Sequence, residues 1–311
     1  MSLFDQPTEF LKGIIAVPAT PFTERDQIDE FSLRRYVRMA LDDGVCGFLV
    51  PALAAEVYML THEERLVIIR TILNEVGGAV PVIGSATADT ADGRRKAVEE
   101  LGTLGCEGIL VYIPYENESE YVAEVMKLEK LIGDKCFLML QDWDLHGSGI
   151  PVPVIAGLFD KVACFRSLKI EVAFAGSKYT AVLKACRNQL HVAGGWASNQ
   201  MIEGLDRGVK AFMPTVLHRI YKKIFDLHKM GERDQAVALF NRFLPVLAFT
   251  RQHPEISIHF NKRLLHRQGI FNTYRLRQNT IVFDAFHERL CRELIDAALA
   301  LSAQVARLNS T

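Results

Sequence analysis

Eight short apolar runs recur along the chain, and longer amphipathic segments separate them. Most runs are rich in valine, isoleucine, leucine or phenylalanine, which is typical of strands buried on both faces of a parallel sheet. The runs are Gly13–Thr20, Gly47–Ala52, Pro81–Thr87, Gly108–Pro114, Cys136–Asp142, Ala163–Ile170, Leu190–Gly195 and Ala211–Val216. Eight strand–helix repeats within about 220 residues predict an α/β protein with a closed (β/α)8 TIM barrel.

A doubly wound open sheet is the alternative fold for such an alternation. That fold carries a glycine-rich phosphate-binding turn after its first strand. The corresponding residues, Pro18-Ala19-Thr20-Pro21-Phe22, contain no glycine. We therefore favour the closed barrel.

The strand pattern ends at Val216, and helical spacing dominates the rest of the chain. Residues 217–230 are expected to form the eighth barrel helix. We predict that the barrel spans residues 11–230 and that residues 231–311 form a C-terminal helical extension, which covers one side of the barrel or builds a subunit contact.

Charge and composition exclude several classes of protein. The chain has 36 Lys and Arg against 37 Asp and Glu, a net charge of −1, and so lacks the basic footprint of a nucleic-acid or membrane-surface binder. No apolar run approaches the roughly 18–20 residues needed to cross a bilayer. Residues 1–7 have neither the basic nor the apolar region of a secretory signal, and the six cysteines form no Cys-x-x-Cys pair. We expect a cytoplasmic protein with a small-molecule substrate.

Lys169 is the strongest candidate for chemistry. Active sites of such barrels lie at the C-terminal ends of the strands, and of the fourteen lysines only Lys169 occupies such an end. Burial lowers the pKa of a lysine, and the neutral amine can attack a carbonyl to form a Schiff base. The alternative is that Lys169 pairs with Glu171 or a phosphate and never becomes a nucleophile.

Other candidates are weaker. Gly194 and Gly195 end the seventh strand, where such barrels often bind phosphate, although a tight turn without a ligand is the simpler interpretation. Only one histidine, His146, lies on an upper loop, so no metal site is expected. Asp142 and Asp144 are possible acid or base groups, or merely solvated carboxylates.

The order and spacing of these motifs resemble the dihydrodipicolinate synthase / N-acetylneuraminate lyase family of class I lyases over nearly the whole chain. The motifs that carry the resemblance are Gly13–Phe22, Gly47–Glu56, Ile113–Asn117, Ser167–Glu171 and Val192–Gly195. The resemblance implies that Lys169 forms the imine and that no organic cofactor or metal is needed. It also implies a homotetramer built as a dimer of dimers.

The chain departs from the family at the positions that relay protons. Leu53 and Ala54 replace two threonines of the second loop, so only backbone N–H groups there could meet a substrate carboxylate. Gln141 takes the place of the catalytic tyrosine, and an amide cannot shuttle a proton as a phenol does. Glu116 matches the tyrosine contributed by a neighbouring subunit, and His146 lies nearest the position of the substrate-binding arginine.

Two functions follow from this pattern. The first is a class I aldolase or dehydratase acting on a 2-oxo acid or sugar-acid derivative. The second is a small-molecule-binding or regulatory barrel that has lost the proton relay. For the enzyme, the expected catalytic residues are Lys169, Gln141 and Glu116, and the expected substrate-binding residues are Leu53, Ala54, Asp142, His146, Gly194, Gly195 and Phe212.

Overall fold

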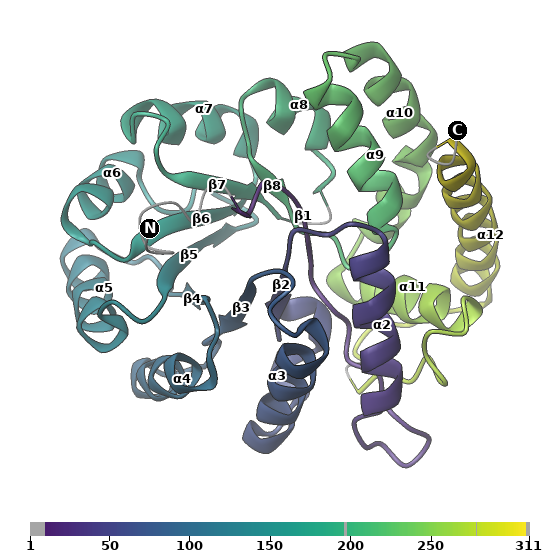
Figure 1. Cartoon of the computed structure of the whole chain (residues 1–311), viewed down its shortest axis with the longest axis horizontal. Coiled ribbons are helices and arrows are strands. Elements are labelled where there is room, and N and C mark those ends of the chain that lie inside the picture. Colours follow the sequence, from purple (N-terminus) through teal and green to yellow (C-terminus); the bar gives the residue numbers. More distant parts are fainter. Residues whose placement is uncertain (1–9, 196–197, 278, 309–311) are drawn as a thin grey trace. The chain divides into compact units, whose positions relative to one another are not determined.

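Eight parallel strands close into a barrel in chain order (Figure 1). The computed structural model describes residues 10–195, 198–277 and 279–308, so residues 1–7, which bear on the expected absence of a secretory signal, lie outside the described residues. The strands are β1 Gly13–Ala16, β2 Gly47–Val50, β3 Val82–Ser85, β4 Gly108–Tyr112, β5 Phe137–Asp144, β6 Phe165–Val172, β7 His191–Gly194 and β8 Ala211–Phe212. The predicted (β/α)8 barrel is confirmed.

Helices follow the strands and continue after the last one. They are α2 Glu30–Asp42, α3 His62–Val76, α4 Ala91–Leu104, α5 Glu118–Ile132, α6 Val152–Lys161, α7 Ala175–Ala185, α8 Met201–Asp206, α9 His218–Lys229, α10 Arg233–Thr250, α11 Pro254–Arg267 and α12 Ala285–Leu308, with two 3-10 turns, η1 Leu53–Ala55 and η2 Val57–Met59. The last helices form the predicted C-terminal helical extension.

Capping residues explain where several helices begin and end. Thr61 caps α3 in a reciprocal capping box with Glu64, because each side chain accepts the other residue's backbone N–H. Gly77 ends the same helix with φ 57°, a left-handed conformation that glycine adopts without steric cost.

The chain forms two compact units. The barrel unit takes the described residues up to Ile15 together with Cys46–Val50 and Gly78–Met213, and it contains nearly all of the strand residues and helices α4 to α8. The helical unit takes Ala16–Val45, Pro51–Gly77 and the described residues from Pro214 onward. The boundary expected at residue 230 remains a prediction.

The core of the barrel unit is apolar. The isoleucine, valine and leucine side chains of β3 to β6 have almost no exposed surface. All six cysteines are free thiols. Burial raises the pKa of Cys106 and of Cys164 to about 12, so these thiols stay protonated and behave as small apolar groups.

Among the described residues, no helix combines the length and apolar character that a membrane crossing requires.

Candidate active site

The pairing of β5 with β6 decides which side chains share a face of the sheet. Gln141 is in register with Lys169, and Trp143 is in register with Glu171. Because alternate residues of a strand point to the same side and partners in register share a face, these four side chains lie on one face. Lys169 is in turn in register with Ala193 of β7. The face therefore carries a polar cluster across β5 and β6, with the small side chain of Ala193 beside it on β7.

Asp142 lies on the opposite face of β5. Its buried carboxylate forms an ion pair with Lys178 of α7, at 2.5 Å between Oδ2 and Nζ, and accepts the backbone N–H of Ile150 at 2.8 Å. Burial raises the pKa of Asp142, and the nearby charge of Lys178 opposes that rise. Because the lysine belongs to a surrounding helix, this face is the outer one. Asp142 therefore has a structural partner away from Lys169.

Phe212 and Gly194 also belong to the outer side of the barrel. A Cβ atom built on Gly194 would approach the Phe212 ring at 2.9 Å, and one built on Gly204 of α8 would approach the same ring at 2.9 Å. The phenylalanine thus fills the space between β7, β8 and α8. The expectation that Asp142, Gly194 and Phe212 contact the substrate does not fit these positions, and we leave them out of the site.

Lys169 and Glu171 form a close pair on the inner face. Nζ of Lys169 lies 3.1 Å from Oε2 of Glu171, and the lysine is only 6% exposed. Gln141 donates from Nε2 to the same carboxylate oxygen at 2.5 Å. One carboxylate is therefore held by an amine from its own strand and an amide from the neighbouring strand.

Gly195 provides the room for this carboxylate. A Cβ atom at position 195 would overlap Oε1, Cδ and Cγ of Glu171. The two adjacent glycines of the sequence therefore have different roles. Gly194 admits the ring of Phe212 on the outer side, and Gly195 admits the side chain of Glu171 on the inner side.

Aromatic residues complete this face on the β4 and β5 side. Tyr112, the last residue of β4, is in register with Gln141. Its ring lies 5.6 Å from that of Trp143, at an interplanar angle of 58°. Burial raises the pKa of Tyr112, and the negative charge of Asp144 raises it further.

The other predicted residues of the barrel unit lie on exposed loops. Glu116 is exposed in the β4–α5 connection, and His146 is exposed in the β5–α6 connection. Asp144 organises the latter loop, because its carboxylate accepts the backbone N–H groups of His146 at 3.1 Å and Gly147 at 2.8 Å. These hydrogen bonds hold the pKa of Asp144 below its usual value. The structure brings neither Glu116 nor His146 into contact with Lys169.

Leu53 and Ala54 belong to the helical unit, where they form η1. The loop is fixed by Glu56, which has a left-handed φ of 56° and a fully buried carboxylate. That carboxylate forms an ion pair with the buried Lys262 and accepts the backbone N–H of Arg277 at 2.7 Å. Burial lowers the pKa of Lys262 to about 8.

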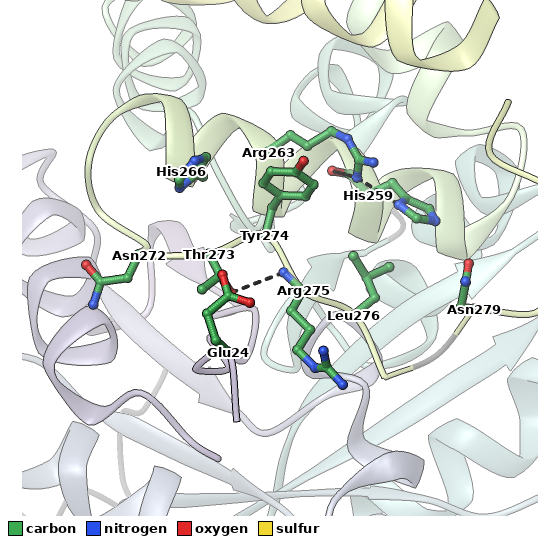
Figure 2. A pocket seen from close by; sticks show the side chains of 10 residues that line it. All are labelled: Glu24, His259, Arg263, His266, Asn272, Thr273, Tyr274, Arg275, Leu276 and Asn279. Carbon is green, nitrogen blue, oxygen red and sulfur yellow. Dashed lines mark hydrogen bonds between the residues drawn. The ribbon is translucent and has the colours of Figure 1, made fainter. Parts of the chain in front are cut away.

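A cavity of about 400 Å³ also lies within the helical unit, between α11 and the segment that follows it (Figure 2). Figure 2 shows Arg263 above the ring of Tyr274, and the guanidinium carbon lies 4.7 Å from the ring centroid. The same guanidinium donates to His259 Nδ1 at 2.8 Å and to Glu288 Oε2 at 3.1 Å. Its hydrogen-bonding capacity is thus used within the protein, and we assign this cavity no ligand.

Glu171, Tyr112 and Trp143 lie on the inner face but are not among the predicted site residues; Glu171 was expected only as a possible partner of Lys169. The signal for Glu171 is the alternation Lys169-Ile170-Glu171-Val172, in which polar and apolar side chains continue the period of the strand for two residues past the expected end. Within the described ranges, no group of three or more His, Cys, Asp or Glu side chains is arranged to hold a metal ion.

Comparisons with known proteins identify the family of the chain. The sequence profile of the Dihydrodipicolinate synthetase family matches residues 10–285. The L-2-keto-3-deoxyarabonate dehydratase of Azospirillum brasilense is 23% identical over 278 residues, which cover 86% of this chain and 87% of that protein.

Solved structures show the same fold. The dihydrodipicolinate synthase of Rhodopseudomonas palustris superposes with a TM-score of 0.85 at 20% identity, covering 94% of this chain and 98% of that one. The N-acetylneuraminate lyase of Fusobacterium nucleatum, solved with pyruvate, gives a TM-score of 0.83 at 19% identity, covering 94% and 98%.

The fold and these matches define a barrel lyase of the aldolase or dehydratase type. The chain belongs to the dihydrodipicolinate synthetase family, as its sequence motifs predict. Relatives include both a synthase and a dehydratase, so the choice of reaction depends on the site itself.

Proposed function

We propose that the protein is a class I lyase that dehydrates a 3-deoxy-2-oxo sugar acid, with Lys169 as the nucleophile and Glu171 as the acid–base group. The single observation that carries the proposal is the carboxylate oxygen of Glu171 placed 3.1 Å from Nζ of Lys169 and hydrogen-bonded to Gln141. A well-positioned carboxylate can perform the proton transfers that threonine and tyrosine hydroxyl groups perform in the family that the chain resembles.

The chemistry balances with these two residues and water. The carboxylate takes a proton from the Lys169 ammonium, and the amine adds to the C2 carbonyl. Glu171 returns this proton to the carbinolamine hydroxyl, which leaves as water and gives the protonated imine, so that Glu171 is again a carboxylate. Glu171 then removes a proton from C3, and the electron pair forms an enamine. The C4 hydroxyl leaves as water with the proton that Glu171 returns. Hydrolysis of the unsaturated imine releases the product and restores the lysine.

One chemical argument and one comparison favour dehydration over aldol cleavage. Dehydration needs one group that removes a proton at C3 and returns it to the neighbouring leaving hydroxyl, and a single carboxylate beside the imine suits both tasks. The Azospirillum relative, which matches along most of both chains, is named as a dehydratase of a keto-deoxy sugar acid.

A ligand-binding barrel without chemistry is the second candidate, and the same ion pair favours it. A buried lysine held by a carboxylate is also a common structural arrangement. The two candidates differ in whether the amine is ever released from Glu171 to attack a carbonyl.

Borohydride trapping tests the proposal. The protein is incubated with pyruvate or with five- and six-carbon 3-deoxy-2-oxo sugar acids, reduced with borohydride and digested. We expect an adduct mass on the peptide containing Lys169, and none in the Lys169→Ala variant. Turnover of at least one sugar acid, with an unsaturated product, supports dehydration; no adduct with any member of the panel contradicts the lyase proposal and favours a binding protein.

We also propose that the protein is a cytoplasmic homotetramer and that Glu116, which is exposed on the single chain, lies at a subunit contact. No metal or organic cofactor takes part, because the imine itself supplies the electron sink.

A further inference from the structure

The inner face carries a phenol on the strand next to Gln141. Tyr112 of β4, Gln141 of β5 and Lys169 of β6 are in register with one another. Adjacent strands lie about 4.8 Å apart, so the Cα atoms of Tyr112 and Lys169 are roughly 10 Å apart across the intervening strand. Both side chains are long, and Gln141 lies between them on the intervening strand.

The hydroxyl of Tyr112 is available for a ligand. None of the hydrogen bonds among the described residues uses this phenol, and the side chain is half-buried. Burial and the charge of Asp144 raise the pKa of Tyr112, so the group keeps its proton at neutral pH. A phenol both donates and accepts a hydrogen bond, which matches an alcohol.

Trp143 supports the ring of this tyrosine from the layer above. It lies two residues after Gln141 on the same face and is in register with Glu171. Its ring is tilted against that of Tyr112 at a centroid distance of 5.6 Å, within the range of favourable aromatic pairs. The pair forms an apolar wall that can pack against C–H groups, with one hydroxyl at its edge.

We infer that Tyr112 and Trp143 select the substrate by its length, with Tyr112 binding a distal hydroxyl and Trp143 packing against the carbon chain. The ligand class is a linear, hydroxylated 2-oxo acid longer than pyruvate. A substrate joined to Lys169 at C2 extends over Gln141 towards β4, where the phenol meets it. Pyruvate is too short to contact Tyr112 or Trp143. The inference rests on the proposed imine at Lys169.

Two reactions separate this role from the chemistry at the lysine. The exchange of the C3 protons of pyruvate with deuterated water, followed by proton NMR, needs the imine at Lys169 and the base, but not the Tyr112–Trp143 pair. Turnover of five- and six-carbon 3-deoxy-2-oxo sugar acids needs the imine, the base and the aromatic pair. The variants are Tyr112→Phe, which removes only the hydroxyl, and Trp143→Phe, which keeps an aromatic ring.

We expect Tyr112→Phe to lower kcat/KM for the sugar acids roughly 10- to 100-fold, as for the loss of a hydrogen bond in a desolvated site. Deuterium exchange into pyruvate should stay within about twofold of the unaltered protein. Trp143→Phe should also lower kcat/KM for the sugar acids, but by a smaller factor. Tyr115→Phe is the matched control, because Tyr115 lies in the loop after β4 and its ring is tilted against that of Tyr121 in α5 at a centroid distance of 5.4 Å; it should change neither reaction.

Equal losses in both reactions, or no loss in either, overturn the inference while leaving the lyase proposal intact. Absence of exchange in the unaltered protein, together with absence of a borohydride adduct, overturns both.

Discussion

Gly195 and Glu171 occupy complementary space: a side chain on residue 195 would overlap the carboxylate that lies beside Lys169. The Gly195→Ala variant should therefore displace Glu171 and lower the rate of C3 proton exchange in pyruvate by roughly 10- to 100-fold, because a misplaced acid–base group loses its contribution.

Gly194→Ala is the control for this prediction, since its methyl group would press on Phe212 at the outer side of the barrel. That variant should lose stability and keep its exchange rate. If Gly195→Ala exchanges protons normally, Glu171 is not the group that moves them.

Gln141 and Asp142 are neighbours in sequence on opposite faces of β5, so their variants should separate function from stability. Asp142→Asn leaves Lys178 buried without its charged partner and should lower the free energy of unfolding by about 3–5 kcal/mol. Gln141→Leu removes the amide that orients Glu171 and should slow the exchange about tenfold with little loss of stability. Urea unfolding and proton NMR measure the two effects; a reversal of this pattern would place the substrate on the other face.

His191 should make the protein less stable in mild acid. Its ring is fully buried, with Nε2 at 2.8 Å from the carbonyl of Leu11 and Nδ1 at 2.7 Å from the hydroxyl of Ser167. Burial lowers the pKa of His191 from 6.5 to about 4. The unfolded chain therefore binds a proton more readily, and the stabilisation present above pH 6.5 is lost as the pH falls towards 4.

This single residue should account for about 2 kcal/mol of the difference in unfolding free energy between pH 8 and pH 5. The His191→Gln variant should show a correspondingly smaller pH dependence in urea titrations. His146→Gln, at an exposed loop position, should leave the pH dependence unchanged. Identical slopes for the unaltered protein and His191→Gln would contradict the assignment.

Lys262 and Glu56 form a buried ion pair that should be strongly coupled in stability. Lys262→Met leaves a buried carboxylate without its cation and should cost about 3–5 kcal/mol. Adding Glu56→Gln should recover part of that loss, because the second change removes the unpaired charge. A double-mutant cycle from urea unfolding measures the coupling, and the partly exposed pair Lys222–Asp226 should show at most about 1 kcal/mol.

The proposed tetramer predicts a light-scattering mass of four times 34.9 kDa at micromolar concentration. Glu116→Arg reverses the charge at the proposed contact and should shift the mass towards smaller species. A mass of 34.9 kDa for the unaltered protein would contradict the assembly.

The strands were predictable because each is a distinct apolar run and the runs recur at regular spacing, and all eight appear at the expected places. Their ends were less predictable, because polar residues on the inner face resemble loop residues. β5 and β6 both continue two residues beyond the expected ends, at Asp142 and Ile170. This extension brings Glu171 into the strand and onto the same side as Lys169.

The residues that share a face were only partly predictable. Period-2 alternation separates Gln141 from Asp142, but the meeting of Gln141 with Glu171 depends on the register between two strands, and one sequence does not contain that register. The pairing of Lys169 with Glu171 was foreseen as the alternative to a nucleophilic role. The structure contains this ion pair, and in the proposed mechanism Glu171 is the acid–base group beside the nucleophilic Lys169.

The continuation of β6 to Val172 has a consequence for how such an enzyme could change during evolution. Both reactive groups are carried by hydrogen-bonded backbone rather than by the connections at the rim. Loops after the strands could then be lengthened, shortened or exchanged to admit new sugar acids, while the distance between amine and carboxylate stays the same.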